Sequence, residues 1–353
     1  MRKIAVPIMR PQLASLVKVN EYLSQTYSNG IFTNNGPLIR KLEENYAKYF
    51  EVDPELVVCS SSATIALEGA TSLSEASHFH CPAYTFPASA LAVLRAGKSL
   101  SFHDIDLESF QMKLEEIPNN SDHGLMYVLP FGASAINVNL YSFKSVVIDA
   151  AASIGNKSLN IKDLPHSWVV VFSLHATKVL GIGEGGISIF GNKKAADTYR
   201  AWINFGFSGT RNSDYSGTNG KLSEISASFG LAALDLVEIE FEEWQRSRDL
   251  TNKLEDSLKL NSFSRKLSGH NPYWIVNLKS NEEKIETTEK LTNAEIQYRD
   301  WWSKGCHKMA AFRSFTEGME FPITDMVANQ TLGLPFFRGM SEEQAEAIHE
   351  CLS

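Results

Sequence analysis

The sequence predicts an α/β protein in which helices cover a mostly parallel sheet, followed by a smaller α+β domain. Short apolar runs alternate with segments of helical periodicity between residues 56 and 190. The runs are continuously apolar, as is typical of strands buried on both faces of a parallel sheet. From residue 222 the pattern turns helical and increasingly charged. This change indicates a bridge out of the large domain.

Each element can be assigned a residue range. An opening helix is expected within residues 12–25, where apolar residues recur on one face. A second helix begins at Pro37, because proline suits a first helical position and Leu38, Leu42 and Tyr46 follow four apart. Buried strands are predicted at residues 56–59, 99–102, 125–129, 145–148, 168–172 and 186–190.

The domain boundary is predicted at residues 235 and 236. Residues 1–235 would form the large α/β domain, and residues 236–353 a small C-terminal α+β domain. The second segment has one strand-like run at 273–278. Helical stretches at 282–291 and 341–352 complete the small domain.

Charge and composition narrow the classes of function. The 353 residues carry a formal net charge of -8 at pH 7, without a basic stripe, which argues against binding nucleic acid or an anionic membrane. Four widely separated cysteines suggest neither a disulfide framework nor a zinc site, and no metal is expected. No segment reaches the length of a membrane span, so a cytoplasmic protein is expected.

The most informative segment runs from residue 172 to residue 186, where a buried strand leads through Lys178 into a glycine-rich return. Burial favours the neutral form of an amine, and a neutral amine attacks aldehydes. Glycines let the backbone approach a ligand closely. The pattern indicates a Schiff-base lysine, although taken alone it is equally consistent with a solvated lysine beside an ordinary turn.

A second candidate is Asp149, which ends the apolar run that begins at residue 146. A carboxylate at the carboxyl end of a parallel strand points into the crevice where such sheets bind ligands. Paired with a protonated pyridine nitrogen, it would keep the ring of pyridoxal 5'-phosphate (PLP) cationic. Without the lysine, a helix N-cap would be the commoner role of this aspartate.

Two further segments complete a possible cofactor site. The hydroxyl-rich stretch 60–64 precedes a helical pattern, and free N–H groups at a helix start bind anions. Ser173 adds a hydroxyl, and Phe86 offers a ring for stacking on a flat cofactor. As isolated features these would be read as N-capping and plain packing. Joined to Lys178 and Asp149, they favour a PLP site.

In this order, the segments resemble the DegT family of PLP-dependent, fold-type I nucleotide-sugar aminotransferases. The likeness covers nearly the whole chain and is most specific at residues 173–186. Shorter matching segments lie at residues 33–37, 62–64, 84–86, 149–151 and 217–224. The resemblance implies an aspartate-aminotransferase-like fold whose large domain holds a seven-stranded, mostly parallel sheet.

The resemblance also implies roles for single residues. Lys178 would form the Schiff base, Asp149 would pair with the pyridine nitrogen and Phe86 would stack on the ring. The implied phosphate ligands are Ala63, Thr64, Ser173 and, reaching into the neighbouring subunit, Asn219. A homodimer with shared active sites is therefore expected.

One position departs from the family pattern. Ala152 stands where the family usually carries Gln or His against the cofactor's phenolic oxygen, and Ser153 or water is expected to substitute. The candidate substrate-binding residues are Asn35, His175, Arg299 and His307. His175 is equally consistent with a structural role and Arg299 with a surface charge.

The implied reaction transfers an amino group from glutamate to a nucleotide-linked keto sugar, giving an amino sugar for a surface polysaccharide or a secondary metabolite. Residues 219–224 resemble members that aminate C4 of dTDP-4-keto-6-deoxyglucose. UDP-linked sugars and amination at C3 stay open. So do a PLP-binding regulator without turnover and a different fold-type I reaction, such as decarboxylation or racemisation. The retained Lys178 and Asp149 weigh against the regulator.

Overall fold

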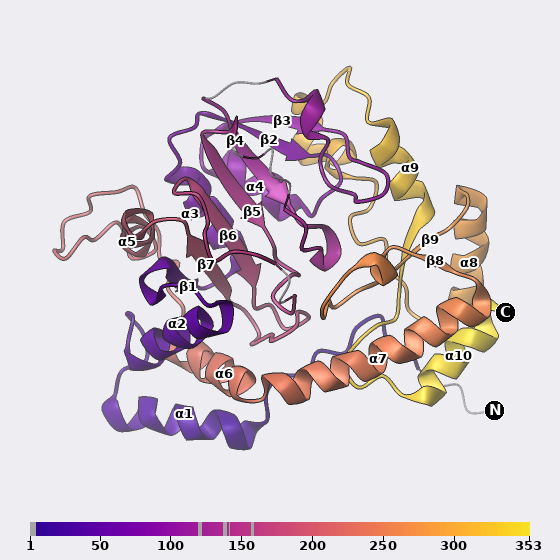
Figure 1. Ribbon diagram of the computed structural model, residues 1–353, viewed down its shortest axis with the longest axis horizontal. Helices are drawn as coiled ribbons and strands as arrows, with labels where there is room; N and C mark the ends of the chain where they lie inside the picture. The colour runs from indigo at the N-terminus through magenta and orange to yellow at the C-terminus, as the bar shows by residue number, and fades with distance from the viewer. Residues whose placement is uncertain (1–4, 119–121, 137–139, 141, 157–158) are drawn as a thin grey trace.

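A seven-stranded sheet forms the centre of the large part of the molecule (Figure 1). The computed structural model describes residues 5–118, 122–136, 140, 142–156 and 159–353. The strand order is β1-β7-β6-β5-β4-β2-β3, and only β7 runs antiparallel to its neighbours. The strands are β1 (Val57–Ser60), β2 (His78–Pro82), β3 (Ser99–His103), β4 (Gly124–Val128), β5 (Ser145–Asp149), β6 (Trp168–Ser173) and β7 (Gly186–Phe190). The predicted α/β class and the six predicted strands are confirmed, whereas β2 was not predicted.

Helices cover both faces of this sheet. One face packs on α3 (Ala63–Ser72), α4 (Pro87–Arg95) and α5 (Lys193–Trp202). The other face packs on α2 (Pro37–Phe50), outside which lie α6 (Glu224–Asp235) and α1 (Leu16–Asn29). Neighbouring residues of one strand therefore enter different cores: Val146 and Ile148 face the α2 side, and Val147 faces α3 and α4. Burial on both sides explains why the strands are continuously apolar.

The C-terminal part is built on a three-stranded antiparallel sheet in the order β10-β9-β8. The long helix α7 (Val237–Leu258) leads into it (Figure 1). Its other elements are β8 (Asn261–Ser262), β9 (Trp274–Asn277), α8 (Asn281–Asn293), α9 (Pro322–Gln330), β10 (Thr331–Leu334) and α10 (Glu342–Leu352). Within the described residues, none of the helices has the length and apolar composition needed to cross a bilayer.

The segment predicted as one helical bridge, residues 222–260, is two helices that meet at Leu236. The predicted domain boundary falls at this junction. Residues 6–8, however, hydrogen-bond to the C-terminal part: Gln297 N–H donates to the Val6 carbonyl at 3.0 Å, and Phe336 N–H to the Ile8 carbonyl at 3.1 Å. The division at residue 235 therefore stays a prediction.

A buried carboxylate from α6 caps the start of α2. Glu224 is fully buried, and its two oxygens accept hydrogen bonds from the N–H groups of Leu38 and Ile39 at 2.8 and 3.0 Å. A negative charge at a helix N-terminus is favourable because it meets unpaired N–H groups and the positive end of the helix dipole. Gly36 makes room for it, since a Cβ there would lie 2.7 Å from Glu224 Cδ.

A second carboxylate caps the start of α9. Asp104 follows β3, and its oxygens accept hydrogen bonds from the N–H groups of Ile323 and Thr324, both at 2.8 Å. The Thr324 hydroxyl donates to it as well, at 2.7 Å. This contact joins the edge of the large sheet to the C-terminal part of the chain.

We expect Glu224→Ala to lower the free energy of unfolding by about 2–4 kcal/mol, because two buried N–H groups lose their acceptor. Urea unfolding followed by circular dichroism measures the change. The matched control is Glu242→Ala on the exposed side of α7, which should stay within about 0.5 kcal/mol of the native chain. Equal stability of the two variants would show that the capping contact contributes nothing.

Candidate active site

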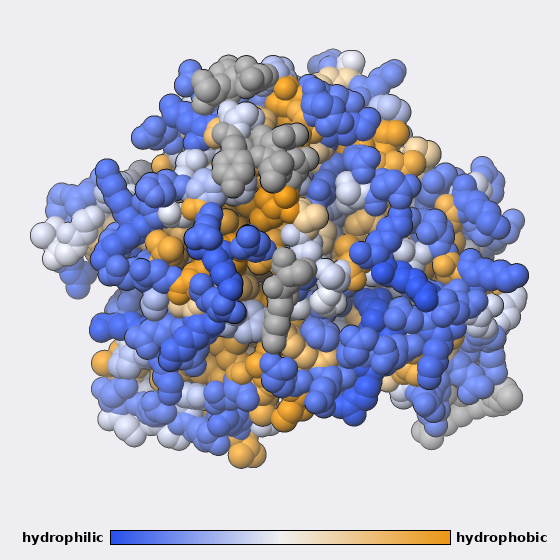
Figure 2. Space-filling view, in the orientation of Figure 1, coloured by the Kyte–Doolittle hydropathy of each residue, from blue (hydrophilic) through white to orange (hydrophobic). Residues whose placement is uncertain are grey.

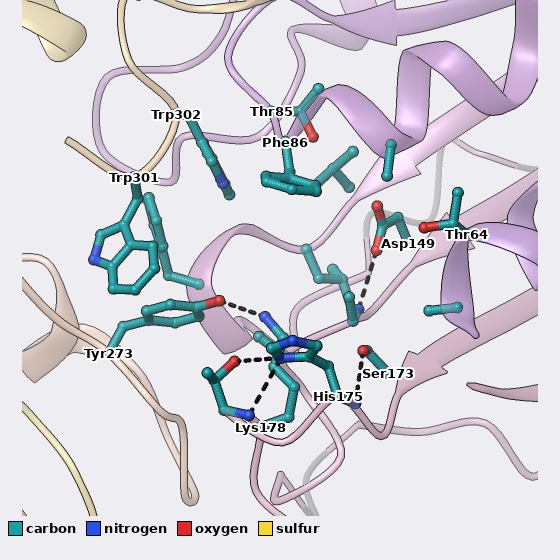
Figure 3. A pocket seen from close by; sticks show the side chains of 18 of the residues that line it. Thr64, Thr85, Phe86, Asp149, Ser173, His175, Lys178, Tyr273, Trp301 and Trp302 are labelled. Carbon is teal, nitrogen blue, oxygen red and sulfur yellow. Dashed lines mark hydrogen bonds between the residues drawn. The ribbon is translucent and has the colours of Figure 1, made fainter. Parts of the chain in front are cut away.

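A cavity of about 390 Å³ opens at the carboxyl ends of the central parallel strands (Figure 3). Val128, Asp149 and Ser173, at the ends of β4, β5 and β6, all line it. Open α/β sheets bind ligands at this edge. The C-terminal part of the chain closes the cavity from the other side with Tyr273 and Trp301.

Asp149 is a buried carboxylate held in a fixed orientation. One of its oxygens accepts a hydrogen bond from the Ser89 hydroxyl at 2.6 Å and the other accepts from the Ala151 N–H at 3.1 Å. Burial raises the pKa of the Asp149 carboxyl, although both hydrogen bonds and the charge of Lys178 act in the opposite direction. A cationic nitrogen in the cavity would stabilise the ionised carboxylate.

Lys178 lies on the connection between β6 and β7, residues 174–185, which turns back along the edge of the sheet. The turn is tight: Lys178 N–H donates to the His175 carbonyl at 2.8 Å, and Gly181 N–H to the Lys178 carbonyl at 3.1 Å. The Lys178 amine donates a hydrogen bond to the Tyr273 hydroxyl. The side chain is half-buried and reaches the cavity, so a ligand can contact the amine.

The first turn of α3 provides an anion site. Ser62 is the N-cap, and its hydroxyl accepts a hydrogen bond from Ile65 N–H at 3.2 Å. The N–H groups of Ala63 and Thr64, at the first two helical positions, have no acceptor within the helix. Both residues line the cavity. A phosphate placed here would accept hydrogen bonds from these N–H groups, and the positive end of the helix dipole would favour its negative charge.

Gly186 allows β7 to pass directly beneath this helix start. It is paired with Ser60 on one side and with Ser173 on the other. A Cβ at this position would lie 2.6 Å from the Ala63 backbone nitrogen and from the Ser62 carbonyl group, which is closer than atoms can approach. The glycine therefore brings the hydroxyl of Ser173 and the start of α3 to the same place.

Aromatic side chains enclose the rest of the cavity. Phe86 precedes α4 and is 56% exposed, and Figure 3 shows its ring between Trp302 and Asp149. Trp302 stacks on Phe131 with ring centroids 4.0 Å apart. Trp301 meets Tyr273 edge to face at 4.9 Å. A flat ligand in this cavity would contact aromatic surfaces, with Phe86 free to stack on it.

Two polar side chains stand at the mouth. The Arg299 guanidinium lies 5.2 Å from the centre of the Trp301 ring, within range of a cation–π contact. His175 Nδ1 accepts from the Thr177 N–H at 3.2 Å, and its Nε2 lies 3.8 Å from a Glu184 oxygen. A ring whose Nδ1 accepts a hydrogen bond carries its proton on Nε2.

The structure gathers most of the residues that the sequence singled out. Those lining the cavity are Ala63, Thr64, Phe86, Asp149, Ser173, His175, Lys178 and Arg299. Asn35, Asn219 and His307 do not line it. His307 is buried against Asp325, with Nε2 2.9 Å from the carboxylate, so within one subunit its position does not match the predicted substrate-binding role.

Asn219 is exposed on the loop between α5 and α6, where its side chain accepts from the Lys221 amine at 2.7 Å. Asn35 borders a separate hollow together with Tyr215 of the same loop. Ala152 does line the cavity, but the hydroxyl of Ser153 is buried and donates to the Ala133 carbonyl at 2.8 Å. Ser153 is therefore not placed to replace the missing Gln or His.

Sequence reasoning did not identify Tyr273, Trp301 or Trp302, which line the cavity, or Ser89, which donates to Asp149. Ser89 lies three residues after Phe86 on α4, so helical spacing from the aromatic could have suggested it. Tyr273, Trp301 and Trp302 come from the C-terminal part, and no local pattern connects them with Lys178.

These groups fit PLP. A lysine amine is present for an aldehyde, a buried carboxylate for a protonated pyridine nitrogen, a helix start for a phosphate and an aromatic ring for a flat ring.

Comparison with known proteins agrees with this fit. The model of the DegT/DnrJ/EryC1/StrS aminotransferase family matches residues 16–353. The dTDP-4-amino-4,6-dideoxy-D-glucose transaminase of Shigella dysenteriae is 31% identical over 238 residues, which are 65% of this chain and 64% of that protein. The match thus spans less than two thirds of that relative's length. GDP-perosamine synthase of Escherichia coli O157:H7 is 25% identical over 99% of this chain and 98% of its own length.

A solved structure from Bacillus cereus, classed as a PLP-dependent aminotransferase, superposes with a TM-score of 0.86 at 25% identity and covers 99% of this chain and 100% of its own. Because the family model extends over nearly the whole chain, this protein belongs to the DegT/DnrJ/EryC1/StrS aminotransferase family, whose members depend on PLP.

Proposed function

We propose that this chain is an aminotransferase that moves an amino group from L-glutamate to the keto group of a nucleotide-linked sugar. The observation that carries the proposal is that the Lys178 amine, the Asp149 carboxylate and the start of α3 meet in one cavity. PLP, when bound, supplies an electron-withdrawing ring that acidifies the carbon next to the substrate's amine.

The chain's own groups would hold the cofactor at four points. Lys178 Nζ would bind the aldehyde, and Asp149 would pair with the ring nitrogen. The N–H groups of the first turn of α3 and the hydroxyls of Thr64 and Ser173 would hold the phosphate. Phe86 would stack on the ring. Each of these side chains lines the cavity.

Lys178 Nζ is also the group proposed to move protons. With an amino donor bound to PLP, the Lys178 amine would carry a proton from the donor's Cα to the cofactor. The Tyr273 hydroxyl, which already accepts a hydrogen bond from Nζ, would keep the amine beside the reacting carbon. Trp301 and Trp302 would keep bulk water from the reacting groups.

At the mouth of the cavity, Arg299 is proposed to bind the anionic groups of the substrates. Arg299 lines the cavity beside the Trp301 ring, and a guanidinium binds carboxylates and phosphates through several N–H donors. His175, with a proton on Nε2, can donate to a sugar oxygen. These two residues are our candidates for substrate binding.

The substrate we favour is dTDP-4-keto-6-deoxyglucose, aminated at C4. The name of the Shigella relative contains a dTDP-linked sugar with its amino group at C4, and residues 219–224 resemble members with this activity. The GDP-perosamine synthase relative makes a GDP-linked sugar the main competitor. A UDP-linked sugar and amination at C3 can be tested in the same panel of substrates.

We also propose that the enzyme is a homodimer in which Asn219 reaches the partner's phosphate site. Asn219 is exposed and lies outside its own cavity. Apolar side chains on α1 are also exposed, among them Leu16, Val17 and Tyr27 at 69, 78 and 69%. Figure 2 shows apolar side chains along the lower left of the molecule, where α1 lies in Figure 1. Burial of this surface by a second copy would explain its composition.

The first test is the absorbance spectrum of the PLP-loaded protein, for the native chain and for Lys178→Ala. We expect a lysine-dependent band that glutamate removes and a keto sugar restores, because the amino group passes through the cofactor in two halves. A panel of dTDP-, GDP- and UDP-linked keto sugars identifies the acceptor by the rate of restoration. Lys279→Ala, at an exposed position, is the matched control. A band that forms without Lys178 and ignores all amino donors would instead favour a non-catalytic PLP-binding protein.

We expect Asp149→Asn to reduce turnover by about 10²–10³, as removal of one charge-stabilising group does in other active sites. In the absence of PLP, the same substitution should stabilise the folded chain at pH values above the pKa of Asp149. The folded-state pKa of Asp149 is raised by burial, so its contribution to stability is lost as pH rises through that pKa. Thermal melts over a series from about pH 4 upward should show the variant gaining stability relative to the native chain as the pH rises.

The matched control is Asp249→Asn, at an exposed position of α7, which should alter neither turnover nor this pH dependence. Unchanged turnover in Asp149→Asn would remove the pairing with the ring nitrogen from the mechanism.

We expect Tyr273→Phe to fold normally and to slow turnover about tenfold or more, because the Lys178 amine loses its hydrogen-bond partner while the ring packing remains. Steady-state kinetics with glutamate should show the loss in kcat rather than in KM. The control is Tyr49→Phe, whose hydroxyl donates to the Ile154 carbonyl away from the cavity. If both variants behave alike, the Tyr273 hydroxyl has no part in proton transfer.

A further inference from the structure

Four histidines gather at the β2–β3 side of the large sheet, and none of them lines the active-site cavity. His78 and His80 lie on β2, His103 ends β3 and His123 immediately precedes β4. The ring centroids of His78 and His123 are 4.5 Å apart, those of His78 and His80 are 4.9 Å apart, and those of His80 and His103 are 4.8 Å apart. We call this group the histidine cluster.

The register of the strands explains why the four rings share one face. Successive side chains of a strand alternate between faces, so His78 and His80 point to one side while Phe79 lies in the core beneath α3 and α4. His80 is paired with Ser101 on β3 and with Leu125 on β4. His103 and His123 each lie two residues from these partners. They therefore point to the same face as His80.

Hydrogen bonds between the rings place their nitrogens close together. His80 Nδ1 lies 2.8 Å from His103 Nε2, and His80 Nε2 lies 2.9 Å from His123 Nδ1. A neutral imidazole binds a metal through the lone pair of one ring nitrogen.

We propose that His78, His80 and His123 form a site for a divalent transition-metal ion, with Zn²⁺ as the probe of that class. One ring nitrogen from each of the three lies within 4.8 Å of the others. Tetrahedral zinc with Zn–N bonds of about 2.05 Å needs ligand nitrogens about 3.4 Å apart. His78 and His123 are half-exposed, so small rotations of their rings can reach this spacing.

His103 is the positioning residue of this site. Its contact with His80 Nδ1 leaves His80 Nε2 as the nitrogen that faces the ion, and such a partner orients a metal-bound imidazole. Three histidine ligands leave a fourth position for water. Imidazole ligands suit zinc, copper and nickel rather than magnesium or calcium. The ion would link β2 to the start of β4, beyond the hydrogen bonds of the sheet.

The test is equilibrium dialysis of the tag-free, PLP-loaded protein against Zn²⁺, with Mg²⁺ in parallel. We expect one Zn²⁺ per chain, at least about tenfold weaker binding in His78→Ala and in His123→Ala, and about 10- to 100-fold weaker binding in His103→Gln. Mg²⁺ should not bind at this stoichiometry. His166→Ala, an exposed histidine outside the cluster, should bind Zn²⁺ like the native chain.

A second measurement does not depend on affinity. Co²⁺ in place of Zn²⁺ should give the strong visible absorbance of a four-coordinate site, which His78→Ala and His123→Ala should lose. Both replaced side chains are half-exposed, so the variants should fold, and circular dichroism checks this. The proposal is overturned if the native chain binds no stoichiometric Zn²⁺, or if these variants bind it as tightly as the native chain.

Discussion

The antiparallel pairing of β7 between β1 and β6 is the constraint on which the site depends. A parallel neighbour would require a crossover to the opposite edge of the sheet, whereas β7 starts at the edge where β6 ends. The connection that carries Lys178 therefore stays above the carboxyl ends of the strands. The same pairing places Gly186 between Ser60 and Ser173. Because this residue has no side chain, the start of α3 and the end of β6 can serve one phosphate.

Buried carboxylates have different roles in this fold, and the donors around each one distinguish them. Glu224 and Asp104 meet the N–H groups of helix starts, so they join distant segments. Among the described residues, Asp149 meets one backbone N–H and one hydroxyl away from a helix start, and it faces a cavity. A buried carboxylate without a helix dipole beside it is costly to ionise unless a cation arrives. Buried carboxylates thus stabilise the fold at Glu224 and Asp104, whereas the carboxylate of Asp149 is available to a cationic ligand.

The part of the site that local patterns encode could be predicted from the sequence. Lys178 and Asp149 follow buried strands, and the start of α3 follows a run of hydroxyl residues, so each lies beside an element that apolar periodicity identifies. Tyr273 and Trp301 could not be placed, because they reach the cavity through tertiary packing across more than ninety residues. His307 was predicted to bind substrate, whereas its side chain is buried against Asp325. No local pattern in the sequence indicates this burial.

The missed strand β2 has a comparable cause. His78, His80 and Pro82 interrupt its apolar run. A prediction based on continuously apolar segments therefore did not identify this strand. Alternation of polar and apolar residues from 78 to 81 would have indicated a strand. The absence of a metal was expected from the spacing of the cysteines alone. The metal site that we propose rests instead on histidines two apart on one strand, whose rings share a face.

The contacts of residues 6–8 also bear on how the chain reaches this structure during synthesis. Ile8 N–H donates to the side chain of Gln297, which lies 289 positions further along the chain, and Val6 pairs with Ile296. A ribosome releases the early residues long before their partners exist, so this segment must wait until most of the polypeptide has emerged. The docking of residues 6–8 therefore follows the synthesis of Gln297 and Phe336, so it is a late step in the folding of this chain.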